Sequence, residues 1–161
     1  MRILLHGGAE TIVDRADADL AQLRWYENKG YARRDVYRDG YIPTYLHRLI
    51  LARKIGRELL PGEQCDHQDG DKLNNQRSNL RLASPAQNRF NCGKRGAGTS
   101  RFKGVHWRSD KQKWAAQIEV RGKSYHLCYT DDEREAAMYY NCAAAALFGP
   151  YARLNDLRKA G

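Results

Sequence analysis

The clearest alternation of apolar and polar positions lies in the carboxy-terminal third of the chain. The segments "FKGVHWRSD" (102–110), "KWAAQIEV" (113–120) and "KSYHLCYT" (123–130) alternate with a period of two, which predicts three strands. Turn-forming pairs separate them, Ser109-Asp110 and Arg121-Gly122. We therefore expect three successive strands in this part of the chain.

The apolar period changes from two to that of a helix after the third expected strand. "AAMYYNCAAAALFG" (136–149) has helical spacing, with a capping box expected from Thr130 to Glu133. Gly149 and Pro150 follow in the order that ends helices. One face of this helix is predicted to be core, formed by Ala136, Ala137, Tyr140, Ala144 and Leu147.

The first sixty residues have shorter and less regular apolar runs. They predict short strands around a helical piece, with a hairpin at the Asp39-Gly40 turn. His47 to Arg53 indicates the start of a helix or a strand-to-helix transition. Pro61-Gly62 is expected to end that element.

A polar stretch separates these two regions. We expect a long loop from Cys65 to Asn79, with Asp66-His67 at the end of a strand. The segment "NLRLA" (79–83) predicts a second short strand, and Asn88 is expected in the first turn of the helix that follows. Three signals predict the start of this helix: Ser84 as the N-cap, Pro85 at the first helical position and Gln87 completing a capping box.

The composition is that of a folded protein with room for two small domains. Of 161 residues, 42% are hydrophobic, and no apolar run approaches the roughly 20 residues of a membrane span. The apolar patch at the amino terminus is too short for a secretory signal, so we expect a soluble, cytoplasmic protein. The four cysteines include no C-x-x-C pair, which favours reduced thiols over a zinc site.

The net charge of +9 is concentrated in one part of the chain. Residues 94 to 126 contain nine Lys or Arg and two Asp or Glu, a net charge of +7. A field of that density attracts polyanions, and with the aromatic residues of the same stretch it favours nucleic acid as the partner. The alternative is a basic surface that only keeps the protein soluble.

The polar stretch also contains a candidate metal site. A hairpin packed on the helix after it could bring Asp66 and Asn88 to one cation, with His67 beside it. Two oxygen ligands with open positions suit Mg²⁺, which keeps water and takes further oxygens from phosphate; Mn²⁺ is another candidate. Thiolate ligands are absent, so zinc fits less well.

Three quoted segments carry a resemblance to a known family. "LHRLI" (46–50), "DHQDGDKLNNQRSNLR" (66–81) and Asn88 resemble the HNH endonucleases, and most closely their phage and intron-associated homing branch. "IVDRADADLAQLRW" (12–25) and "GYARR" (30–34) also resemble the amino-terminal part of that branch. The resemblance implies a ββα-metal (His-Me finger) nuclease domain.

The same resemblance implies a role for each matching residue. His67 would be the general base that activates water. Asp66 and Asn88 would hold the metal, and Asn79 would pin the loop and orient His67. His47 would support the site. The last motif position is Asn rather than His, and a carboxamide oxygen still binds Mg²⁺.

Other polar residues of the stretch have simpler interpretations. Asn74 and Asn75 are interpreted as loop-forming residues rather than ligands, and Asp69 and Asp71 as solvated turn carboxylates. Cys65 stands where an aliphatic residue is usual and is interpreted as a small core residue.

Residues 101 to 155 resemble the Apetala/ethylene-response-factor DNA-binding domain of plants. The shared marks are "GV" (104–105), "KWAAQI" (113–118) and "EAAMYYNCAAAALFGPYARLN" (135–155). The resemblance implies a three-stranded antiparallel sheet, backed by one helix and laid into the major groove of double-stranded DNA. Trp114 and Ile118 are instead expected on the apolar, helix-facing side of their strand. The expected DNA-binding residues are Lys103, His106, Arg108, Lys113, Gln117, Arg121, Lys123 and His126.

Together these features predict an α+β protein of two domains. We expect an HNH endonuclease domain at 1–92, a basic glycine-rich linker at 93–100 and a DNA-binding domain at 101–157. The expected function is a sequence-recognising DNA endonuclease of homing type, encoded by a phage or prophage and active in the bacterial host cell without a protein partner. The alternative is a DNA-binding regulator whose nuclease domain is inactive.

Overall fold

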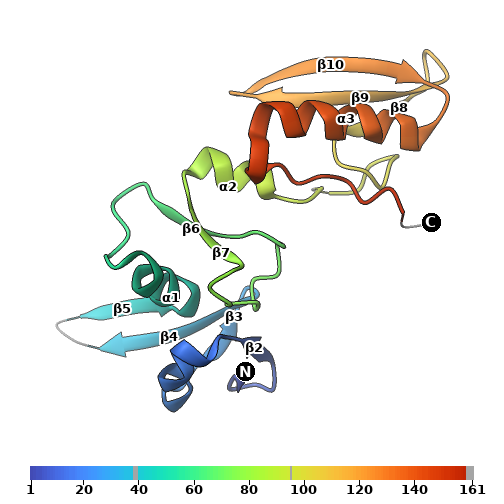
Figure 1. Ribbon diagram of the computed structural model, residues 1–161. Helices are drawn as coiled ribbons and strands as arrows, with labels where there is room; N and C mark the ends of the chain where they lie inside the picture. The colour runs from blue at the N-terminus through green and yellow to red at the C-terminus, as the bar shows by residue number, and fades with distance from the viewer. Residues whose placement is uncertain (38–39, 95, 159–161) are drawn as a thin grey trace. The chain divides into compact units, whose positions relative to one another are not determined.

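The computed structural model describes residues 1–37, 40–94 and 96–158. The chain divides into two compact units, Met1–Arg89 (unit 1) and Phe90–Gly161 (unit 2), which are coloured blue to green and yellow to red in Figure 1. Both contain antiparallel sheets and helices, so the fold is of the mixed α+β class.

Unit 1 contains three small antiparallel sheets, with strand orders β1-β2, β3-β4-β5 and β6-β7. Two helices accompany them, the 3-10 helix η1 (Arg15–Gln22) and α1 (Leu46–Ile55). The strands are β1 (Arg2–Leu4), β2 (Glu10–Ile12), β3 (Tyr26–Asn28), β4 (Tyr31–Tyr37), β5 (Tyr41–Tyr45), β6 (Gln64–His67) and β7 (Leu80–Ala83).

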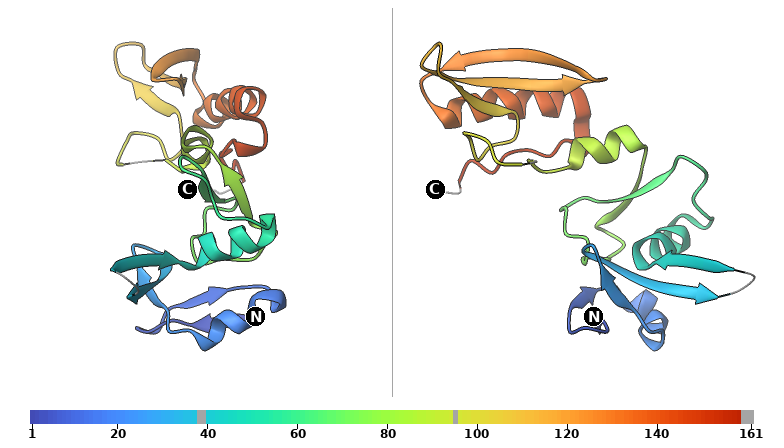
Figure 2. Two further views of the ribbon diagram at one scale, coloured as in Figure 1. Left: turned by 90° about the vertical axis from the view of Figure 1, so that its left-hand side faces the viewer. Right: turned by 180° about the vertical axis from the view of Figure 1, so that it is seen from behind.

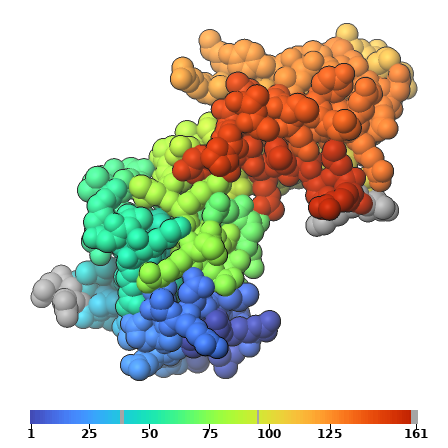
Figure 3. Space-filling model, viewed as in Figure 1, coloured from blue at the N-terminus to red at the C-terminus, as the bar shows by residue number. Residues whose placement is uncertain are grey.

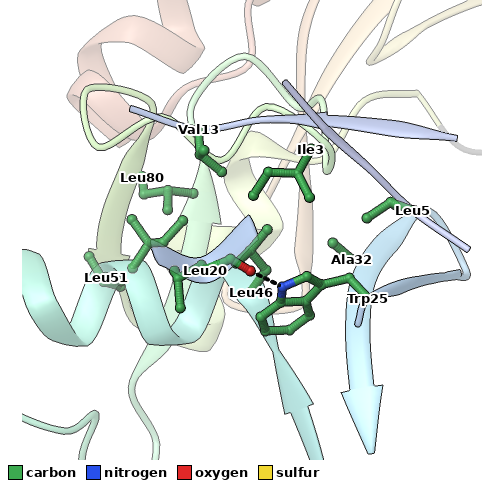
Figure 4. Close-up of a cluster of buried hydrophobic side chains, with 10 residues drawn as sticks. Ile3, Leu5, Val13, Leu20, Trp25, Ala32, Leu46, Leu51 and Leu80 are labelled. Atoms are coloured by element: carbon green, nitrogen blue, oxygen red, sulfur yellow. Dashed lines mark hydrogen bonds between the residues drawn. The ribbon is translucent and has the colours of Figure 1, made fainter. Parts of the chain in front are cut away.

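Trp25 belongs to the core of unit 1 and lies near Leu20, Leu46 and Ala32 (Figure 4). It is 1% exposed, and its indole Nε1 donates a hydrogen bond to the carbonyl of Leu20 at 2.8 Å. Helix α1 adds Leu46, Ile50 and Leu51, which are fully buried at helical spacing. Aliphatic side chains from the first hairpin, α1 and β7 therefore share one core.

Two expectations for the amino-terminal region have different outcomes. The hairpin is confirmed, because β4 and β5 pair from Arg33↔Tyr45 to Tyr37↔Tyr41, whereas Asp39 of the expected turn lies outside the described residues. The expected helix end at Pro61-Gly62 is wrong. Helix α1 ends at Gly56, whose φ of 73° lies in the left-handed region that glycine adopts without strain.

The polar stretch forms a hairpin followed by a short helix. β6 and β7 pair antiparallel, with Asp66 opposite Arg81, and α2 (Pro85–Asn91) comes next. The expected capping box is confirmed: Gln87 N donates to Ser84 Oγ at 3.2 Å and Ser84 N to Gln87 Oε1 at 2.8 Å. The expected loop is shorter than Cys65 to Asn79, because Cys65 to His67 belong to β6.

Unit 2 has the expected antiparallel sheet, with strand order β10-β9-β8, and α3 lies along one of its faces (Figures 1 and 2). The space-filling view presents the helix side of this unit in red (Figure 3). The elements are β8 (Val105–Arg108), β9 (Lys113–Val120), β10 (Lys123–Thr130), α3 (Glu133–Phe148) and the 3-10 helix η2 (Gly149–Tyr151).

Two details of α3 correct the expectations. Its N-cap is Asp132 rather than Thr130, because the Asp132 carboxylate accepts hydrogen bonds from the backbone N–H groups of Arg134 and Glu135. Leu147 is 56% exposed, and the neighbouring Phe148 is buried in its place. Phe148 stacks on Phe90 with 3.9 Å between ring centroids, so the aromatic pair determines which side chain enters the core.

All four cysteines are free thiols, and Cys65 packs partly buried against the core of unit 1. Burial raises the pKa of the Cys65 thiol to about 12, which keeps it protonated. Within the described ranges, none of the helices combines the length and apolar character needed to cross a membrane.

Candidate active site

His67 lies at the end of β6 and is 5% exposed. Its ring centroid is 5.2 Å from that of His47 on α1 and 6.1 Å from that of Tyr31 on β4. Cys65 lies on the same side of β6 because side chains alternate along a strand, and its Sγ donates to the carbonyl oxygen of His47 at 3.5 Å. Three elements therefore fix the position of the imidazole.

Asp66 points to the other side of β6 and is 3% exposed. Its Oδ2 accepts from Arg81 Nε at 2.8 Å and pairs with Arg81 Nη2 at 2.7 Å. Asn88 donates from Nδ2 to Oε1 of Gln64 at 2.6 Å, and Gln64 lies two residues before Asp66. Asp66 and Asn88 are thus on the same side of the hairpin.

The side chains on this side of the hairpin have the donor chemistry of a magnesium site. One carboxylate and one carboxamide offer hard oxygen ligands, as Mg²⁺ prefers. In the part of the chain that the structure describes, no three His, Cys, Asp or Glu side chains gather as a closed metal cluster. Asp66 and Asn88 therefore fit an ion that takes its other ligands from water and phosphate, and Arg81 competes for Asp66 Oδ2.

His47 is a neutral residue beside His67. It is 8% exposed, and among the described residues its Nδ1 is the buried side-chain nitrogen without a hydrogen-bond partner. Burial, then the neighbouring His67 and Arg48 charges, lower the pKa of His47 to about 3. The imidazole of His47 is therefore neutral at neutral pH.

The pKa of His67 is also lowered, mainly by burial. A hydrogen bond with Asn75 and the charges of Asp69, Asp66 and Asp71 act in the opposite direction. The imidazole is therefore neutral at neutral pH. A neutral imidazole has a lone pair that can accept a proton, which is the requirement for a general base.

Asn79 ties the two ends of the loop after His67. Its Nδ2 donates to Asp69 Oδ1 at 2.9 Å and to the carbonyl oxygen of Asn74 at 2.8 Å, and its Oδ1 accepts from Asp69 N at 3.0 Å. Its backbone carbonyl accepts from Gln68 N at 2.9 Å. The side-chain carboxamide of Asn79 therefore closes the loop that begins directly after His67.

Most of the remaining polar residues of the loop form turns, and one of them, Asn75, makes a buried contact with His67. Asp69 and Asp71 are exposed turn carboxylates, as interpreted, and each accepts a backbone N–H two residues ahead. Asn74 donates to Asp69 Oδ2 at 2.7 Å and forms the loop. For Asn75 the loop-forming interpretation is incomplete, because this fully buried side chain contacts His67 Nε2 at 3.2 Å.

Five of the expected DNA-binding residues share one face of the sheet in unit 2. The register pairs His106 with Ala115, Arg108 with Lys113 and Gln117 with His126, and paired residues point to the same side. Trp114 and Ile118 alternate to the opposite side, where they pack against the helix-side core as expected. The outer face is therefore formed by His106, Arg108, Lys113, Gln117 and His126.

The other three expected DNA-binding residues lie elsewhere. Lys103 donates from Nζ to the carbonyl oxygens of Phe90 and Cys92 at 2.8 and 2.7 Å, so its ammonium secures the backbone before the sheet. Lys123 pairs with Val120 on the helix side of the sheet. Arg121 is exposed in the β9–β10 turn with φ of 52°.

Two cations of the outer face are already paired within unit 2. Arg108 donates from Nε and Nη2 to the carboxylate of Asp110 at 2.8 Å, and Lys113 Nζ lies 3.1 Å from Asp131 Oδ2. Both pairs are exposed, and exposed pairs contribute little to stability. A phosphate can therefore replace either carboxylate at small cost.

Comparison with known proteins gives three findings. Residues 44–90 match the family described as HNH endonuclease. The chain is 32% identical over 144 residues to "Uncharacterized HNH endonuclease L560" of Acanthamoeba polyphaga mimivirus, covering 86% of this chain and 70% of that protein. It is 33% identical over 92 residues to "Protein 3.8" of Escherichia phage T7, covering 57% of this chain and 75% of that protein. No solved structure matches the chain.

Proposed function

The chain belongs to the HNH endonuclease family, and from that membership we propose a metal-dependent, sequence-recognising DNA endonuclease of homing type. The observation that carries the proposal is the buried, neutral His67 at the end of β6, next to a hairpin side that presents Asp66 and Asn88. In this proposal β6, β7 and α2 form the ββα-metal arrangement.

Each residue of the site has a role in phosphodiester hydrolysis. His67 accepts the proton of the attacking water, and Asn79 holds the loop that carries it. His47 stays neutral and packs against the base. Asp66 and Asn88 would hold a divalent cation such as Mg²⁺ or Mn²⁺, and a bound cation would stabilise negative charge on the phosphate and the leaving oxygen.

Unit 2 is proposed to hold the DNA. We assign a nuclease domain to residues 1–92, a linker to 93–100 and an Apetala/ethylene-response-factor-like domain to 101–157. The support is the sheet of β8, β9 and β10 with one helix, and the polar outer face that its register produces. A sheet of this width fits the major groove, where phosphate contacts provide affinity and base contacts provide specificity.

The proposed setting is a viral or mobile element. The two relatives come from a virus and a phage, which supports a phage- or prophage-encoded enzyme acting on double-stranded DNA in the host cytoplasm. No part of the proposed reaction requires a second protein.

A DNA-binding regulator with an inactive nuclease unit is the second candidate. One observation favours it: Asp66 Oδ2 forms an ion pair with Arg81. A metal ion must either displace Arg81 from this oxygen or share the oxygen with it. A regulator would bind DNA as tightly as the enzyme and never cut it.

Cleavage of supercoiled plasmid separates the two candidates. We expect nicked or linear product with Mg²⁺ and none with a chelator, and His67→Ala should lose about 10²- to 10⁴-fold in rate. His6→Ala is the matched control, because His6 is an exposed histidine of the same unit. An inert wild type with Mg²⁺ and with Mn²⁺ would establish the regulator, and a fully active His67→Ala variant would exclude His67 as the base.

A further inference from the structure

Asn75 and Thr11 connect His67 to the first hairpin of the chain. His67 Nε2 lies 3.2 Å from Asn75 Oδ1, and Asn75 Nδ2 donates to Thr11 Oγ1 at 2.7 Å. Thr11 Oγ1 in turn donates to the carbonyl oxygen of Leu73 at 2.7 Å. Thr11 and Asn75 are both fully buried, so water does not compete for these hydrogen bonds.

The direction of every hydrogen bond in this series is fixed by its last member. The Leu73 carbonyl can only accept, so the Thr11 hydroxyl uses its single proton there. The hydroxyl oxygen must then accept from the amide group of Asn75, which turns the Asn75 carbonyl oxygen toward His67. A carbonyl oxygen accepts only from N–H, so Nε2 of His67 carries the ring proton.

We propose that Thr11 and Asn75 are positioning residues that set the tautomer of the general base. With the proton on Nε2, the lone pair of the neutral ring is on Nδ1, and Nδ1 is the atom that takes the proton from water. This inference rests on the proposed function of His67, because a tautomer matters only for a group that moves a proton.

Backbone pairing makes the arrangement possible. The loop from Leu73 to Asn75 adds to β2 as a parallel neighbour: Ile12 N donates to the Leu73 carbonyl at 2.8 Å, and Asn75 N to the Ile12 carbonyl at 2.7 Å. Thr11 stands 64 residues before Asn75 and lies outside residues 44–90, where the family match is found. The base of this chain thus depends on a segment beyond the matched region.

Nitrogen NMR of the full-length protein, labelled at its histidine rings, tests the tautomer directly. The protonated and the bare ring nitrogens give well-separated signals, and the His67 signals are those missing from His67→Gln. Wild type should have the proton on Nε2, a form that free imidazole side chains also favour, so the variants decide.

Thr11→Val should shift the tautomer and Thr11→Ser should not. Valine keeps the shape but removes the acceptor that fixes the orientation of the Asn75 amide. The amide is then free to rotate and donate to Nε2, and in that orientation the ring proton is on Nδ1. Loss of one such hydrogen bond should change the ratio of tautomers about five- to tenfold. Serine keeps the hydroxyl and is the matched control.

Asn75→Leu and Asn75→Asp form the second pair. Leucine removes the acceptor for Nε2–H, whereas a carboxylate still accepts, so the wild-type tautomer should persist in Asn75→Asp alone. An Nε2–H tautomer unchanged in both Thr11→Val and Asn75→Leu, with both proteins folded, would overturn the proposal.

Single-turnover cleavage at saturating DNA separates this inference from the proposed function. If it holds, Thr11→Val should cut about five- to tenfold more slowly than Thr11→Ser with the same affinity for DNA. The wild-type protein could fail to cut DNA while the His67 tautomer still shifts in Thr11→Val. That result would contradict the proposed nuclease function but support the effect of Thr11 and Asn75 on the tautomer. Equal cleavage rates despite a shifted tautomer would overturn the positioning role alone.

Discussion

The two units of the chain differ most in what they bury. Among the described residues, unit 1 buries seven polar or charged side chains: Thr11, Asp17, His47, Asp66, His67, Asn75 and Asn79. Unit 2 buries three, namely Asn91, Ser100 and Thr130. Burial of polar groups is unfavourable unless each finds partners, and it shifts pKa values. The unit with the larger buried polar set is the one whose geometry supports proton chemistry.

The net charges of the two units differ in the opposite direction. Residues 1–89 contain fifteen Lys or Arg and twelve Asp or Glu, a net charge of +3, whereas residues 90–161 contain thirteen and seven, a net charge of +6. The smaller unit therefore has twice the net charge of the larger one. A polyanion is therefore attracted more strongly to unit 2, whereas the buried His67 lies in unit 1.

Truncating the buried tryptophan should have the largest effect on this comparison. Trp25→Ala removes a 1%-exposed side chain and its hydrogen bond, which we expect to cost unit 1 about 3–5 kcal/mol. Leu4→Ala, at a 70%-exposed position of β1, is the control. Hydrogen exchange followed by mass spectrometry should show lost protection in residues 1–89. Equal loss in residues 90–161 would mean that the units are not energetically separate.

A glycine substitution tests unit 2 in the same way. A methyl group at Gly104 would overlap the ring of Tyr140, and its φ of 76° is unfavourable for other residues. We expect Gly104→Ala to destabilise unit 2 by at least about 1–3 kcal/mol. Gly122→Ala has the same φ with open space around it, so it measures the backbone effect alone. Equal losses in both variants would contradict the predicted clash.

Removing the cap of α3 should have a smaller effect in the same unit. The Asp132 side chain accepts two backbone N–H groups at the start of the helix, so Asp132→Ala should cost about 1 kcal/mol. Asp131→Ala is the neighbouring control, and Asp132→Asn should retain most of the stability. Chemical denaturation curves of the variants measure the difference in the free energy of unfolding. If Asp131→Ala destabilised the protein as much as Asp132→Ala, Asp132 would not be the N-cap that stabilises α3.

The buried aspartate of unit 1 predicts that the stability of this unit depends on pH in acid. Asp17 is fully buried, and its ion pair with Arg77 at 2.8 Å lowers its pKa below the ordinary value of 3.8. Its contribution is therefore complete above that value and is lost as the pH falls through the lower folded pKa. The stability difference between wild type and Asp17→Asn should shrink in acid. A difference independent of pH would contradict the prediction.

Local signals were sufficient for much of the fold. The Ser84 capping box, the strand at Leu80–Ala83 and the three strands of unit 2 follow from patterns within a few residues, and the structure contains them. The end of α1 was misplaced because Gly56 and Pro61-Gly62 both carry breaker signals, and the nearer glycine caps the helix.

Contacts distant in sequence explain what could not be predicted. Asn75 stands in a polar loop and has no local feature that sets it apart from Asn74; only pairing of its backbone with β2 brings Thr11 to it. Lys103 has the charge of a DNA contact, yet carbonyl oxygens before the sheet bind its ammonium. Leu147 and Phe148 are both apolar, and packing against Phe90 decides between them.

The division of labour between the units is tested most directly by the salt dependence of DNA binding, measured together with single-turnover cleavage. Arg108→Gln/Lys113→Gln removes two charges from the outer face, and Arg134→Gln/Arg158→Gln removes two from exposed positions outside it. Both variants leave the residues around His67 unchanged.

We predict that the first variant flattens the logarithmic salt slope by about two units and the second leaves it nearly unchanged, because each lost phosphate contact contributes about 0.9. Both should cut saturating DNA at the wild-type rate, whereas His67→Ala should bind with the wild-type slope and fail to cut. Equal slopes for all four proteins would contradict the account, as would a cleavage defect in the outer-face variant at saturation.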